Sequence, residues 1–160
     1  MAEFSAHVRQ ARSNLEFLAD LNTISNKWDW KVTISFYVVV HLVNAHTAQQ
    51  ADMHYRTHKS VEDAISPFGK IQALRLDAGT FSSYMAIKNL SRRARYLCTD
   101  DGSRPSDALL TYDKHLQKAL HHLDLILTWF SAKYPGNDFT PLAINCPALT
   151  KNLVHFLKSD

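Results

Sequence analysis

Three histidines stand close together in the sequence, around the point where an apolar run gives way to a polar one. His41 lies one turn after the aromatic pair Phe36-Tyr37 within the apolar run, and His54 and His58 follow four residues apart after a polar break. An imidazole inside an apolar helix requires a hydrogen-bond partner, or else it transfers protons or binds a ligand. His41 and His58 are therefore the first candidates for chemistry in this chain.

Two interpretations of these histidines compete. His54 and His58, at positions i and i+4 of a helix, can hold a transition metal with His41 as the third ligand. No acidic residue joins them in an HExxH-type arrangement, however, and the same spacing arises by chance. We therefore favour a His41 that is hydrogen-bonded to a neighbouring helix and a His58 that opens the next helix, and we expect no bound metal.

A cluster of basic side chains is the second feature that can do chemistry. The net charge is only +3, yet residues 68–104 contain seven basic residues against three acidic ones. Focused positive charge of this kind can bind a phosphate backbone, although a solvated helix face gives the same pattern. The seven basic residues are Lys70, Arg75, Lys88, Arg92, Arg93, Arg95 and Arg104.

Composition and length limit the kind of protein that carries these residues. The 160 residues, 46% hydrophobic and 21% charged, are typical of one globular domain. Cys98 and Cys146 are far apart, which predicts free thiols in a reducing compartment. The polar N-terminus lacks the apolar core of a signal peptide, and the run Phe36–Val43 is too short to span a bilayer. We expect a cytoplasmic protein without a membrane partner or a cofactor, and the absence of a glycine-rich phosphate loop argues against P-loop and Rossmann chemistry.

The positions of glycine, proline and apolar residues predict an all-α fold. Every glycine and proline falls between segments whose apolar residues recur at three- and four-residue steps, and no segment alternates as a strand does. The sequence therefore predicts an up-and-down bundle of four to five helices over residues 1–135. Residues 136–160 are expected to add a loop and a short helix to the same domain. The predicted helices cover about Glu3–Asn22, Trp28–Gln50, Thr57–Ser66, Thr80–Cys98, a long helix from near Pro105 to Phe130, and Pro147–Lys158.

With the helices placed, the order of the motifs resembles the HEPN family, the higher eukaryotes and prokaryotes nucleotide-binding helical bundles. Members of that family bind or cut RNA or nucleotides, and the resemblance covers about Ala11 to Tyr134. It rests on an aromatic-Tyr-x-x-x-His element, a Thr-His-Lys element and an arginine-rich element ending in tyrosine, which are here Phe36-Tyr37 to His41, Thr57-His58-Lys59 and Arg92-Arg93-Ala94-Arg95-Tyr96.

The chain departs from the ribonuclease members of that family at two places. Those members carry an arginine that is followed by four to six residues and then a histidine; the histidine moves a proton and the arginine stabilises phosphate charge. No histidine of this sequence has an arginine at that distance upstream, and Arg95 stands where the family pattern has an aspartate. Arg92 or Arg93 can still meet His41 or His58 through the fold.

The resemblance implies an RNA- or nucleotide-binding protein related to RNase components of toxin-antitoxin or defence systems. The implied activity is that of a metal-independent endoribonuclease, with His41, His58 and Arg93 as catalytic residues. Ligand binding would fall to Tyr37, Arg92, Arg95 and Tyr96. The implied partners are a second copy, bound near the second and basic helices, and a cognate antitoxin or nucleotidyltransferase. A non-catalytic dimerisation or protein-interaction module and a histidine-based metal-binding bundle are the alternatives.

Overall fold

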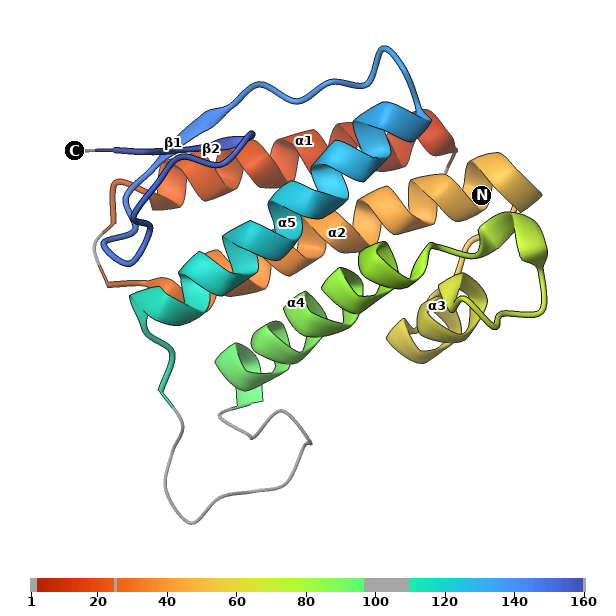
Figure 1. The fold of residues 1–160 in the computed structure, drawn as a ribbon, viewed down its shortest axis with the longest axis horizontal. Coiled ribbons are helices and arrows are strands. Elements are labelled where there is room, and N and C mark those ends of the chain that lie inside the picture. The colour runs from red at the N-terminus through yellow and green to blue at the C-terminus, as the bar shows by residue number, and fades with distance from the viewer. Residues whose placement is uncertain (1–2, 25, 97–109, 160) are drawn as a thin grey trace.

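A computed structural model describes residues 3–24, 26–96 and 110–159 of the chain (Figure 1). The described residues form a helical bundle, as the sequence predicts. The helices are α1 (Phe4–Leu21), α2 (Trp28–Ala51), α3 (His58–Ile65), the 3-10 helix η1 (Gln72–Leu74), α4 (Ala78–Tyr96) and α5 (Asp113–Lys133). Two short strands, β1 (Leu142–Ile144) and β2 (Phe156–Lys158), follow α5.

Helix α2 is the centre of the bundle, because it packs against α1, α4 and α5. The four long helices run alternately in opposite directions along the chain (Figure 1). A helix that is apolar on several sides must be buried on several sides. Accordingly, Val32, Phe36, Val39 and Leu42 of α2 are all fully buried. Among the described helices, none combines the length and the apolar character that crossing a membrane requires.

The predicted boundaries of the first four helices agree with the structure to within two residues wherever they are described. Helix α2 ends where Asp52 adopts a left-handed conformation, with φ of 51°. Helix α3 begins after Thr57, whose hydroxyl accepts a hydrogen bond from the backbone N–H of Ser60 at 3.1 Å. His58 is therefore the first residue of α3, as predicted. The predicted end of the basic helix at Cys98 lies outside the described residues.

The predicted start of the long helix near Pro105 is wrong. Pro105 itself lies outside the described residues, but residues 110–112 are not helical and α5 begins at Asp113. The ring of His115 accepts a hydrogen bond from the backbone N–H of Tyr112 at 2.9 Å. This side-chain contact satisfies an N–H group that a longer helix would use itself, and so it fixes the helix start. Helix α5 packs against α2, and its residues Leu116, Leu123 and Phe130 are buried.

The predicted helix over Pro147–Lys158 is also wrong, because this segment forms turns and strand β2. Strands β1 and β2 pair in parallel, with Leu142 opposite Phe156. The buried carboxylate of Asp124 on α5 accepts hydrogen bonds from the backbone N–H groups of Val154 at 3.3 Å and His155 at 2.7 Å. Backbone groups that bind a neighbouring side chain are not free to form a helix. The segment still packs on the bundle core, through Ile144 and Phe156 among others.

Replacing Asp124 tests this anchor of the C-terminal segment. Its carboxylate also contacts the Nδ1 atom of His155 at 3.0 Å, and both side chains are buried. We expect Asp124→Ala to lower the free energy of unfolding by about 3 kcal/mol, because several buried partners lose a charged acceptor. Urea denaturation measures this loss, and hydrogen exchange at Val154 and His155 should accelerate. The exposed Asp138 is the control, whose replacement by alanine should change stability by less than about 0.5 kcal/mol.

Candidate functional site between helices α3 and α4

A pocket of about 310 Å³ lies between α3 and the second half of α4. Lys88, Arg92 and Arg95 are spaced at i, i+4 and i+7 on α4, which places them on one face of that helix. His58 and Glu62 are spaced at i and i+4 on α3 and face them across the pocket. The described lining is completed by Lys59 and Tyr96.

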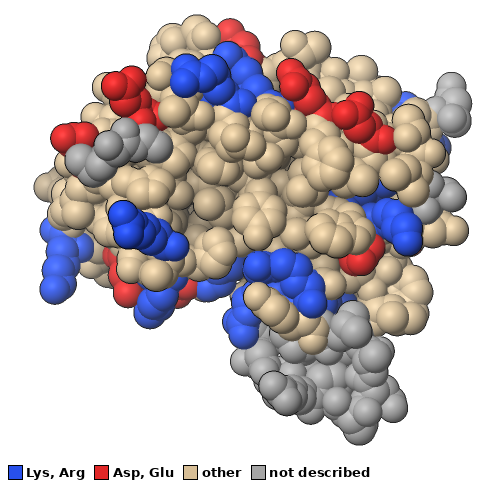
Figure 2. All heavy atoms as spheres, turned by 180° about the vertical axis from the view of Figure 1, so that it is seen from behind, with Lys and Arg blue, Asp and Glu red and all other residues tan. Residues whose placement is uncertain are grey.

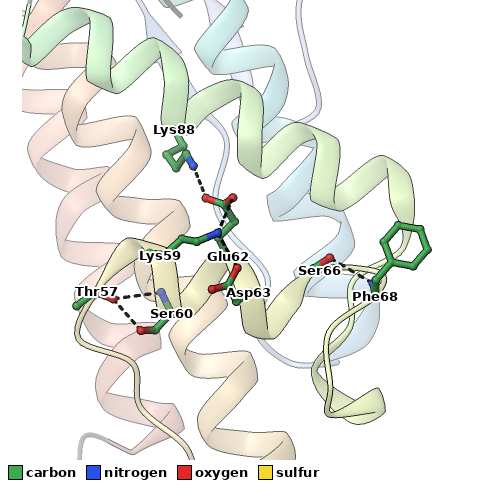
Figure 3. A network of polar contacts seen from close by, with 8 residues as sticks. All are labelled: Thr57, Lys59, Ser60, Glu62, Asp63, Ser66, Phe68 and Lys88. Atoms are coloured by element: carbon green, nitrogen blue, oxygen red, sulfur yellow. Dashed lines mark hydrogen bonds and ion pairs between the residues drawn. The ribbon is translucent and has the colours of Figure 1, made fainter. Parts of the chain in front are cut away.

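The pocket carries a net positive charge. Lys59, Lys88, Arg92 and Arg95 oppose a single carboxylate, that of Glu62, within the described lining. Glu62 forms an ion pair with Lys88 and a looser one with Lys59, whose Nζ atom lies 3.8 Å from the carboxylate (Figure 3). Glu62 thus holds the two lysines in place without neutralising the pocket. An anion is the ligand that such a pocket favours.

The guanidinium of Arg95 is held against aromatic rings. Its central carbon lies 5.1 Å from the ring centre of Tyr96 and 6.0 Å from that of Phe36. Its Nε atom donates a hydrogen bond to the backbone oxygen of Ser91 at 3.3 Å. Such contacts favour one orientation of the planar group, which limits the entropy lost when it binds a ligand. The ring of Tyr96 itself is 67% exposed and is available to a second ring.

His58 lies beside these cations in the neutral form. Its ring centre is 5.2 Å from that of the buried Phe36. Partial burial lowers the pKa of His58 below its usual value, and the positive charges of Arg95 and Lys88 lower this pKa further. A neutral imidazole at neutral pH can accept a proton from a bound ligand.

The structure brings together some of the predicted site residues and separates others. His58, Arg92, Arg95 and Tyr96 line the same pocket. Arg93 instead donates a hydrogen bond to the backbone oxygen of Leu110 at 3.2 Å. Its charge acts on His115 at the start of α5, where burial first and Arg93 second lower the pKa of the imidazole.

His41 belongs to a second group of side chains, together with His7 and His54. The two ring nitrogens of His7 lie 3.1 Å from Nδ1 of His41 and 3.1 Å from Nδ1 of His54, so that His7 bridges the other two imidazoles. Burial lowers the pKa of His7 to about 4, and the neighbouring His41 and His54 lower it too. Sequence reasoning missed His7 because it lies 34 residues before His41. Its position on the buried stripe of α1 was the available signal.

This histidine group is a chain of contacts and not a shared site for a metal ion. Each nitrogen of His7 faces a different neighbour, and His54 precedes α3 instead of sharing that helix with His58. Within the described ranges, no group of three histidine, cysteine, aspartate or glutamate side chains is arranged to hold a metal ion. The geometry therefore gives the metal-binding alternative no support.

Tyr37, a predicted ligand-binding residue, is half-buried, and its ring centre lies 6.4 Å from that of Phe36.

His46 is the interior histidine that is hydrogen-bonded to neighbouring elements. Its Nε2–H donates to the backbone oxygen of Leu74 at 3.2 Å, and its Nδ1 accepts from the hydroxyl of Tyr134 at 2.6 Å. A carbonyl oxygen can only accept, so these contacts define the neutral tautomer of His46. Burial lowers the pKa of His46 to about 4, although the hydrogen bond to Leu74 acts in the opposite direction and raises this pKa. The prediction that His41 is hydrogen-bonded to a neighbouring helix is confirmed by its contact with His7 on α1, and His46 is a second histidine of this kind.

Comparison of this chain with models of protein families, with curated proteins and with solved structures finds no match. Its function must therefore be inferred from the chemistry of the residues themselves. The pocket between α3 and α4 offers fixed cations, a neutral imidazole and an exposed aromatic ring. These groups can bind a phosphate and a base, and they can accept a proton.

The low pKa of His46 predicts that acid destabilises the fold. In the unfolded chain an imidazole takes up a proton near pH 6.5, whereas His46 in the folded chain does so only near pH 4. The unfolded state therefore binds more protons in this window, and stability falls as the pH decreases from about 6.5 to 4. His46 alone should contribute a loss of roughly 3 kcal/mol, since one pKa unit is worth about 1.4 kcal/mol.

Urea denaturation at several pH values measures this contribution. His46→Gln should flatten the dependence of stability on pH, although the variant is less stable at pH 7. His121→Gln is the matched control, because His121 is exposed on α5. A variant at His46 with the wild-type pH dependence would show that this group does not titrate as described.

Proposed function

We propose that this protein binds a phosphate-bearing ligand, RNA or a nucleotide, in the pocket between α3 and α4. The observation that carries the proposal is that four cationic side chains and His58 line one pocket. Arginine guanidinium groups bind phosphate oxygens in pairs of hydrogen bonds, and lysines contribute point charges. The resemblance of the sequence motifs to HEPN bundles supports the same class of ligand.

The surface around the pocket fits an extended polyanion. On the face seen in Figure 2, several Lys and Arg side chains lie in the lower half, and another group of them lies near the upper edge among most of the acidic side chains. Helices α3 and α4 lie in the lower half of Figure 1, and the half-turn about the vertical axis keeps that half at the bottom of the view in Figure 2. A ligand that passes over this half can place one phosphate among the cations and one base on the exposed ring of Tyr96. Single-stranded RNA has both groups.

Two neighbouring arginines give a sharp test of this binding site. Arg95→Ala should raise the dissociation constant for a labelled single-stranded RNA by about 10- to 100-fold, because a charged hydrogen bond is worth roughly 1.5–3 kcal/mol. Arg93→Ala removes the same charge from the same helix but faces Leu110, and it should change binding by less than about threefold. Fluorescence anisotropy at several salt concentrations measures both, and binding should weaken as salt increases.

Equal losses in the two variants would show that only the overall charge matters. That result would contradict a site between α3 and α4.

A second candidate function is metal-independent cleavage of RNA, which the position of His58 beside Arg95 favours. In this reaction His58 accepts the proton of a ribose 2′-hydroxyl, and the 2′-oxygen attacks the adjacent phosphorus. The bond from phosphorus to the 5′-oxygen of the next nucleotide breaks, and that oxygen takes up a proton. The products are a 2′,3′-cyclic phosphate and a 5′-hydroxyl. Arg95 and Arg92 would stabilise the charge that builds up on the phosphate oxygens.

Cleavage in the presence of a chelator tests this second candidate. His58→Ala should lower the cleavage rate by roughly 10²- to 10⁴-fold, the usual contribution of a general base, while RNA binding changes little. His121→Ala is the control for the loss of an exposed histidine. Binding without any cleavage by the wild-type protein would leave a binding function alone.

A further inference from the structure

Phe68 is the most exposed of the large hydrophobic side chains described. Its side chain is 92% exposed and points away from α3 (Figure 3). Beside it lies an open pocket of about 670 Å³ whose apolar lining includes Met53, Tyr55 and Ile71. Single exposed apolar residues need no explanation, but an exposed ring next to an apolar hollow marks a contact surface.

The turn that presents Phe68 is rigid. The backbone N–H of Phe68 donates to the hydroxyl of Ser66 at 3.2 Å, and that of Gly69 donates to the backbone oxygen of Ser66 at 2.8 Å. Arg75 donates a hydrogen bond from Nε to the oxygen of Gly69 at 2.7 Å. A Cβ atom at Gly69 would lie 2.5 Å from the oxygen of Ala64, so the turn is closely packed on α3. These contacts fix the backbone that carries the ring, so that little backbone entropy is lost on binding.

The same surface carries charges of opposite sign. Asp63 and Lys70 both line the pocket beside Phe68, and both are exposed. Asp63 already forms an ion pair with Lys59 at 2.8 Å, but 62% of its side chain remains accessible. The ring and the hollow, and the acid and the base, are two complementary pairs on one surface, and a two-fold contact between identical chains needs such a self-complementary surface.

We propose that this surface, formed by Met53, Tyr55, Asp63, Phe68, Lys70 and Ile71, joins two copies of the chain. Phe68 of each copy enters the apolar pocket of the other, and Asp63 of each copy faces Lys70 of the other. This inference does not depend on the phosphate site. The sequence had placed a dimer interface near the second and basic helices, whereas this surface lies on α3 and the turn after it.

The two sides of α3 make this contact compatible with the phosphate site. Ser60, Asp63 and Ala64 line the pocket beside Phe68, whereas His58 and Glu62 line the pocket toward α4. A second copy would therefore cover one side of α3 and leave the other side open.

The association state of the wild-type chain and of a variant without the ring of Phe68 tests the proposal. Sedimentation velocity from low to high micromolar concentration should show a dimer for the wild-type protein. Phe68→Ala should weaken the dimer by at least about tenfold, as expected for a central contact residue. Phe17→Ala, which removes another exposed ring from α1, is the matched control and should leave the dimer unchanged.

Asp63→Lys and Lys70→Asp should each weaken the dimer, because each places like charges opposite one another. The double variant Asp63→Lys/Lys70→Asp should restore it to within about threefold, since the exchanged charges attract again in a two-fold pair. Circular dichroism verifies that each variant is folded. A wild-type chain that stays monomeric overturns the proposal, even if its pocket binds an apolar dye. A dimer that persists in Phe68→Ala, or one that the double variant does not restore, overturns it too.

Discussion

The ring of Phe36 connects the core of the bundle to the charged pocket. It is fully buried on α2, and its centre lies 6.1 Å from that of Tyr84 on α4. The same ring contacts the imidazole of His58 and the guanidinium of Arg95. Contacts of this one residue with both α3 and α4 therefore help to place the side chains of the pocket. Loss of the ring would leave a cavity under the site as well as in the core.

Burial beside such rings explains why the described histidines with resolved shifts all have lowered pKa values. Charging an imidazole inside the bundle costs more than charging it in water, and neighbouring cations or imidazoles add to that cost. For His46, burial favours the neutral form, although the hydrogen bond to Leu74 opposes this effect. For His58, the same effect leaves a proton acceptor beside a phosphate site. One physical cause thus makes the fold sensitive to acid at one position and leaves a proton acceptor at another.

The helices could be predicted because their apolar spacing follows from burial, and the two errors arose where one side chain decides the backbone. His115 sets the start of α5 and Asp124 holds the C-terminal segment, and neither contact leaves a periodic signal. At the site, the i, i+4 and i+7 spacing on α4 could have been read directly. Consecutive residues on a helix point about 100° apart, so Arg92 and Arg93 could not both face His58. The contact of His7 with His41 depends on how α1 and α2 pack, which one sequence does not specify.

Helix α3 carries the two proposed contacts on opposite sides, and Lys59 connects them. Its ammonium contacts Asp63 at 2.8 Å on one side and Glu62 at 3.8 Å on the other (Figure 3). A phosphate bound among the cations would attract Lys59 toward the pocket and weaken its pair with Asp63. That carboxylate would then be more available to Lys70 of a second copy. If both contacts form, phosphate binding and pairing of the chains should strengthen each other, because a coupling free energy acts equally in both directions.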